Sequence, residues 1–104
     1  MARFDVYANP EPAERRATPY FLDVQNDHIS GMATRVVVPL RRESAFGPRA
    51  ARLHPTIELR GEPLVLDTAA LGAVPLRELR APLANVRQHA ALVQDALDAL
   101  FGAY

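Results

Sequence analysis

Three histidines and two serines are the first side chains to consider for acid–base, metal or nucleophilic chemistry. The histidines are His28, His54 and His89, and their spacing contains no i, i+4 pair and no accompanying set of acidic residues. Ser30 and Ser44 lack the Gly-x-Ser-x-Gly pattern that presents a catalytic serine. The chain has no cysteine, which excludes thiolate chemistry. The sequence therefore predicts no catalytic residue, no metal site and no cofactor, with the histidines as surface or capping side chains.

Four arginines that lie close together could instead follow a phosphate backbone. Glu43 interrupts them, and Phe46 is the one aromatic ring between them. All twelve basic residues of the chain are arginine, and twelve acidic residues balance them to a net charge of zero. A solvated basic loop is therefore favoured, with RNA contact as the minority alternative. The cluster consists of Arg41, Arg42, Arg49 and Arg52.

The length of 104 residues favours one domain, spanning 1–104, with a modest core. Apolar residues make up 49% of the chain, which argues against disorder. The start of the chain has no apolar signal core, and no run approaches the length of a membrane span. We expect a soluble, cytoplasmic protein.

Short alternating stretches predict five or six strands between about residues 3 and 80. The third stretch, Arg35 to Leu40, is apolar on both faces and should lie mid-sheet or against another subunit, ending near Pro39. A tight connection at Gly61 should join two strands as a hairpin. The predicted strands fall at 4–8, 20–25, 35–40, 54–60 and 64–67, with an extended stub at 74–76.

The C-terminal stretch, about 82–101, predicts one helix with an apolar stripe. Pro82 suits its first turn, and Gly102 should end it in the left-handed conformation, leaving the tail 102–104. The stripe consists of Leu83, Val86, Val93, Leu97, Leu100 and Phe101. These elements favour a mainly β fold, a small, partly open antiparallel barrel with the helix beside it. A domain this small can hide few apolar faces, so a homodimer is favoured over a monomer.

Segments along the whole chain resemble the CcdB toxins of toxin–antitoxin modules. The most specific are the Asp23-Val24-Gln25 segment and the Val38-Pro39-Leu40 strand end. Further matching segments are Phe4 to Tyr7, Tyr20 to Asp27, Leu53-His54-Pro55, Gly61-Glu62, Ala73-Val74-Pro75 and Leu100-Phe101.

This resemblance implies a homodimer with an SH3-like barrel and a C-terminal helix, which is not an enzyme. It implies a toxin that binds the A subunit of DNA gyrase, traps gyrase on cleaved DNA, and is neutralised by a CcdA-like antitoxin. The gyrase contact is implied for Gly102, Ala103 and Tyr104, with His28, Ile29 and Asp98 as secondary candidates. The dimer seam is implied for Leu97, Leu100, Phe101, Val36 and Val37.

The tail departs from the family pattern. The best-known members end Phe-Trp-Gly-Ile, whereas this chain ends Phe101-Gly102-Ala103-Tyr104 and contains no tryptophan. Tyr104 is the residue that could replace the missing aromatic anchor. One alternative is a CcdB-fold protein that binds an antitoxin as a decoy or regulator without poisoning gyrase. A less favoured one is an endoribonuclease of the MazF and Kid type, which would need Arg with His or Asp in one groove.

Overall fold

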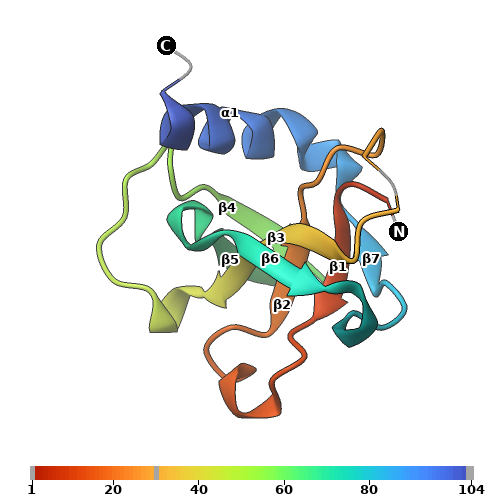
Figure 1. Cartoon of the computed structure of the whole chain (residues 1–104). Coiled ribbons are helices and arrows are strands. Elements are labelled where there is room, and N and C mark those ends of the chain that lie inside the picture. The colour runs from red at the N-terminus through yellow and green to blue at the C-terminus, as the bar shows by residue number, and fades with distance from the viewer. Residues whose placement is uncertain (1, 30, 103–104) are drawn as a thin grey trace.

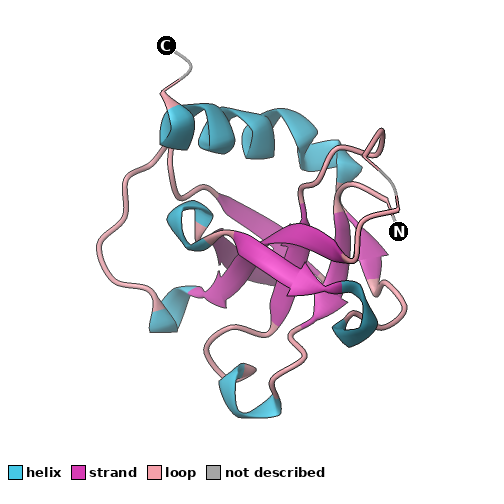
Figure 2. Ribbon diagram, in the orientation of Figure 1, coloured by secondary structure: helices cyan, strands magenta, loops and turns pink. Residues whose placement is uncertain are grey.

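The computed structural model describes residues 2–29 and 31–102, and shows a curved antiparallel sheet with one helix against its end (Figures 1 and 2). The strands of the described part are β1 (Asp5–Ala8), β2 (Tyr20–Asp23), β3 (Thr34–Arg42), β4 (Thr56–Leu59), β5 (Glu62–Leu66), β6 (Gly72–Pro75) and β7 (Ala84–Asn85), and the helix is α1 (Ala90–Phe101). Short 3-10 turns are η1 (Pro12–Glu14), η2 (Glu43–Ala45), η3 (Thr68–Ala70), η4 (Leu76–Glu78) and η5 (Arg87–His89). The predicted fold class, a mainly β partly open barrel with one C-terminal helix, is confirmed.

The sheet is built around β3. Its strand order is β4-β5-β3-β2-β1-β7, and β6 also pairs with β3. The mid-sheet position predicted for residues 35–40 is therefore confirmed. The prediction that Pro39 ends this strand is wrong, because β3 continues to Arg42. Pro39 lies where β3 changes partners, since pairing with β6 stops at Val37 and pairing with β5 begins at Leu40. A missing N–H is tolerated at such a break in the ladder.

The predicted start of the helix is also wrong. Residues 84–85 form β7, and regular α-helix begins at Ala90. The N–H of Leu83 donates to the Val6 carbonyl at 2.8 Å, and that of Val86 donates to Phe4 at 2.9 Å. The free edge of β1 thus recruits a segment whose composition favours a helix, and pairing overrides propensity. Gly102 ends α1 with φ 74°, as predicted. No helix of the described part is long and apolar enough to cross a membrane.

The core lies between the concave face of the sheet and α1. Val93, Ala96 and Leu97 of the helix are buried against a large apolar cluster that includes Val6 and Leu22. A smaller cluster on the other face joins Tyr7, Val37 and Leu79. Both faces of β1 are therefore buried.

The β4–β5 hairpin turns through Arg60 and Gly61, which have φ values of 53° and 78°. Two residues with positive φ form the turn that matches the twist of a hairpin. Gly61→Ala should lower the free energy of unfolding by about 1 kcal/mol, because Cβ is disfavoured in the left-handed region. Gly47→Ala is the matched control, since Gly47 has open space and an ordinary φ. Equal urea midpoints for the two variants would contradict this expectation.

Candidate functional site

The loop after β2, residues 24–29, presents His28 and Ile29 at the surface, and Ile29 is 49% exposed. Two neighbouring side chains brace the loop. Asn26 Oδ1 accepts from the N–H of His28 at 2.9 Å. Gln25 Oε1 accepts from the N–H of Val36 at 3.0 Å, and its Nε2 donates to the Ile29 carbonyl at 3.4 Å. The side chains of Asn26 and Gln25 therefore hold the two predicted contact residues, His28 and Ile29, in place. Their hydrogen bonds run within the loop and, from Gln25, to β3.

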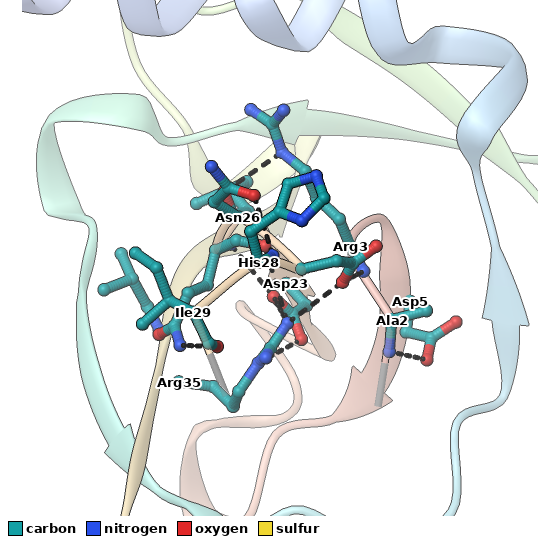
Figure 3. A network of polar contacts seen from close by, with 12 residues as sticks. Ala2, Arg3, Asp5, Asp23, Asn26, His28, Ile29 and Arg35 are labelled. Atoms are coloured by element: carbon teal, nitrogen blue, oxygen red, sulfur yellow. Dashed lines mark hydrogen bonds and ion pairs between the residues drawn. The ribbon is translucent and has the colours of Figure 1, made fainter. Parts of the chain in front are cut away.

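A buried ion pair anchors the start of this loop (Figure 3). Arg35 donates through Nε to Asp23 Oδ2 at 2.8 Å and through Nη2 to Asp23 Oδ1 at 2.9 Å. Asp23 is fully buried and Arg35 is 7% exposed. The N–H of Gln25 also donates to Asp23, at 3.0 Å. The hydrogen bond to Asp23 raises the pKa of Arg35 above its ordinary value, so this guanidinium stays charged.

Tyr7 lies beside this pair. Its hydroxyl donates to Asp5 Oδ2 at 3.4 Å, and the side chain is fully buried. Burial, followed by the negative charges of Asp5 and Asp23, raises the pKa of Tyr7 to about 12.

This shift predicts alkaline destabilisation. Because the folded pKa lies above the unfolded value of 10.0, the stabilisation is complete below pH 10 and is lost as pH rises through 12. We expect a loss of about 3 kcal/mol over this window from Tyr7 alone, at roughly 1.4 kcal/mol for each pH unit. The chain has no lysine to titrate there. In urea denaturation, the free energy of unfolding of Tyr7→Phe should fall less between pH 10 and pH 12 than that of the wild type. If both proteins showed the same pH dependence, Tyr7 would not be the group responsible for the alkaline loss.

Arg3 connects the loop to the helix. Its backbone N–H donates to Asp27 Oδ1 at 2.8 Å, and its Nε donates to the Val24 carbonyl at 3.2 Å. Its Nη2 donates to Gln94 Oε1 at 3.0 Å, and Gln94 Nε2 donates to Asp98 Oδ1 at 2.9 Å. This chain of contacts links Asp98, through Gln94 and Arg3, to the loop that carries His28 and Ile29. Sequence reasoning missed Arg3 and Gln94, because neither belongs to a motif.

The end of α1 supplies the other half of the predicted contact. The N–H of Gly102 donates to the Asp98 carbonyl at 2.9 Å. Phe101, the last helical residue, is 71% exposed, which is a large apolar surface for one side chain. Ala103 and Tyr104, which sequence reasoning assigned to the same contact, lie outside the described residues.

The residues assigned to a dimer seam fall into two groups. Leu97 and Val37 are buried within the single chain, so their surface is already covered. Val36 is half-buried and packs against the main cluster. Leu100 is half-buried and Phe101 is exposed, which leaves the end of α1 as the accessible part of the seam. The dimer itself stays a prediction.

Of the other side chains considered for chemistry, His54 has structural partners. His54 Nδ1 accepts from the N–H of Ala50 at 3.1 Å, and its ring packs 4.9 Å from that of Phe46. His89 directly precedes α1. Among residues 2–29 and 31–102, no group of three His, Cys, Asp or Glu side chains could hold a metal ion. Ser30 lies outside the described residues.

Three arginines of the basic cluster lie near carboxylates, and two of them, Arg41 and Arg42, belong to β3 rather than to a solvated loop. Arg42 Nε lies 2.7 Å from Glu62 Oε2, and Arg49 Nη2 lies 3.0 Å from Glu43 Oε2. Arg41 Nη1 lies 3.8 Å from Asp67 Oδ2. These carboxylates reduce the positive field that a phosphate backbone would need.

Comparison with known proteins gives one family and one fold. The family model described as CcdB protein matches residues 3–102. No curated protein matches the chain significantly. Among solved structures, the chain is similar to one described as an endoribonuclease in complex with its cognate antitoxin from Mycobacterial species. That likeness covers 100% of this chain and 97% of the other, with a TM-score of 0.77 and 17% identity. At this identity the likeness supports the fold alone.

Proposed function

This chain belongs to the CcdB family, and we propose that it is the toxin of a type II toxin–antitoxin module. Its target is the A subunit of DNA gyrase, which it traps in complex with cleaved DNA, and a CcdA-like antitoxin neutralises it. It acts by protein–protein binding and carries out no catalysis of its own.

The observation that carries this proposal is the bridge made by Arg3. The resemblance assigns the gyrase contact to two separate segments, the loop of His28 and Ile29 and the end of the helix. Arg3 donates to the loop and, through Gln94, reaches Asp98 on α1. These hydrogen bonds link the two segments, and each segment carries an exposed apolar side chain, Ile29 in the loop and Phe101 at the end of α1. Exposed apolar side chains with a polar surround are typical of protein-binding surfaces.

The same geometry weighs against a ribonuclease. Arg35 and Asp23 lie close together, but both are buried and their polar atoms are used in a two-pronged contact with each other. A catalytic arginine must reach a phosphate, and this one faces a carboxylate instead.

A gyrase assay tests the proposal. Purified protein added to gyrase and plasmid DNA should inhibit supercoiling and accumulate cleaved complexes, and its overexpression should stop growth. Addition of an antitoxin encoded beside the gene should restore both. Normal growth with soluble, folded protein would exclude an active toxin.

The missing tryptophan of the tail favours a second candidate, an antitoxin-binding decoy or regulator. Such a protein would purify together with a CcdA-like antitoxin and leave gyrase unaffected. Incubation of the pure protein with RNA separates both from an endoribonuclease, since intact RNA removes that alternative.

We also propose a homodimer that uses the end of α1. Sedimentation equilibrium should give twice the chain mass of 11.4 kDa. Phe101→Asp should weaken the dimer at least ~10-fold, because a buried carboxylate loses its hydration. Leu92→Asp, on an earlier exposed turn of the same helix, is the control. A wild-type chain that sediments as a monomer at high concentration would refute the dimer.

A further inference from the structure

A second candidate binding site lies away from α1. A cavity of about 540 Å³ opens between the end of β1, the turn η1 and the segment that follows β6. In Figure 1 the orange turn of residues 12–14 and α1 lie at opposite ends of the molecule. The cavity is therefore separate from the face described above. It is lined by Ala8, Pro10, Pro12, Arg15, Arg77, Glu78, Arg80, Ala81 and Leu83.

The charges of this cavity are not balanced. Three arginines and one glutamate line it, in a chain whose net charge is zero. None of the ion pairs between described residues involves Arg15, Arg77 or Arg80. The arginines of the 41–49 stretch, in contrast, each face a carboxylate. The cavity therefore holds guanidinium groups whose donors are open to a ligand.

The walls that carry these arginines are fixed. Arg15 Nε donates to the Asn9 carbonyl at 2.6 Å, which leaves its two terminal nitrogens for another acceptor. Asn9 is buried, and its Nδ2 donates to the Thr18 carbonyl at 2.9 Å. On the other wall, Leu79 lies in the sequence between Arg77 and Arg80 and is buried against Tyr7 and Val37. The backbone segments that carry the arginines are thus anchored to the sheet on both sides of the cavity. Binding of a ligand would therefore need little ordering of these segments.

The remaining lining is apolar. Pro10 and Pro12 give rigid hydrocarbon surface on one side, and Leu83, which is 39% exposed, supplies it on the other. Among the described residues, no aromatic ring lines the cavity for a base to stack on. A ligand with spaced carboxylates and one or two apolar side chains fits this lining better than a nucleic acid.

We propose that this cavity is a docking site for an acidic peptide segment of a partner protein. Its Asp or Glu side chains would accept paired hydrogen bonds from Arg77, Arg80 and the free end of Arg15. A Leu or Ile of the segment would pack against Pro10, Pro12 and Leu83. The site is independent of gyrase binding, so it stands or falls separately from the function proposed above.

The probe is a synthetic peptide of about ten residues in which Glu and Asp flank Leu and Ile. Titrated into ¹⁵N-labelled protein, it should shift amide signals of residues 8–15 and 77–83 and leave those of α1 unchanged. The double variant Arg77→Glu/Arg80→Glu should weaken this binding at least ~10-fold. The matched control is Arg49→Glu/Arg52→Glu, which changes the net charge equally in the 46–55 loop and should bind like the wild type.

Three outcomes would overturn the proposal. Equal weakening by the two double variants would show attraction to net charge rather than to this cavity. If a peptide with Gln and Asn in place of Glu and Asp bound as tightly, the cavity would not recognise the carboxylates. Tighter binding of a single-stranded oligonucleotide through the same arginines would assign the cavity to nucleic acid. Amide spectra of each variant establish beforehand that it is folded.

Discussion

Arg35→Ala should lower the free energy of unfolding by about 3–5 kcal/mol. The substitution leaves the carboxylate of Asp23 buried, with the N–H of Gln25 as its remaining donor in this group. A buried charge without its partner is far more costly than the pair is stabilising. The loss should appear as a lower urea midpoint with an unchanged slope.

Two controls separate this effect from the general loss of an arginine. Arg49→Ala removes an exposed pair with Glu43 and should cost less than about 1 kcal/mol. The double variant Asp23→Leu/Arg35→Met replaces both charges by apolar groups and should recover much of the loss. If Arg35→Ala and Arg49→Ala were equally stable, the buried pair would not anchor this part of the fold.

Tyr104→Ala should abolish the accumulation of cleaved gyrase–DNA complexes. Tyr104 is the aromatic residue of a tail that lacks the tryptophan of the best-known family members. Truncation of an aromatic anchor in a protein interface commonly costs about 2 kcal/mol or more, which is a loss of roughly 30-fold in affinity. The cleavage assay measures this directly at increasing concentrations of the protein.

The control for this variant is Leu92→Ala, an exposed apolar residue earlier on α1. Both variants should unfold at the wild-type urea concentration, and only Tyr104→Ala should lose activity. An active Tyr104→Ala would show that the tail aromatic does not replace the missing tryptophan. The exposed ring of Phe101 would then be the next candidate for the anchor.

Most of the fold could be predicted because it depends on local pattern. Alternation identified the strands up to residue 76, and Gly61 and Gly102 identified a turn and a helix end. The errors occur where tertiary pairing decides. Residues 84–85 have helix-forming neighbours, but they complete the edge of β1. Pro39 lies inside a strand because β3 changes partners there, and no single-sequence signal records which strands pair.

The candidate site was predicted in part, through its motif. The Asp23-Val24-Gln25 segment indicated the loop, and the structure gives the reason, since Asp23 pairs with Arg35 and Gln25 braces Ile29. Asp23 and Arg35 lie twelve positions apart in the sequence, and no spacing rule predicts their contact. Arg3 lies 91 residues from Gln94 in the sequence, so their hydrogen bond depends entirely on the folded arrangement.

The short pairing of β1 with β7 has a consequence for the order of folding. It consists of two register pairs, Asp5 with Asn85 and Val6 with Ala84, between segments at opposite ends of the sequence. Closing so long a loop has a high entropic cost for so few bonds, so β7 and α1 should dock last and detach first. Amide hydrogens of this unit should exchange faster than those of β3. A partner that holds the 24–29 loop to α1 would raise the free energy of this opening, and would thereby protect the whole chain from proteolysis.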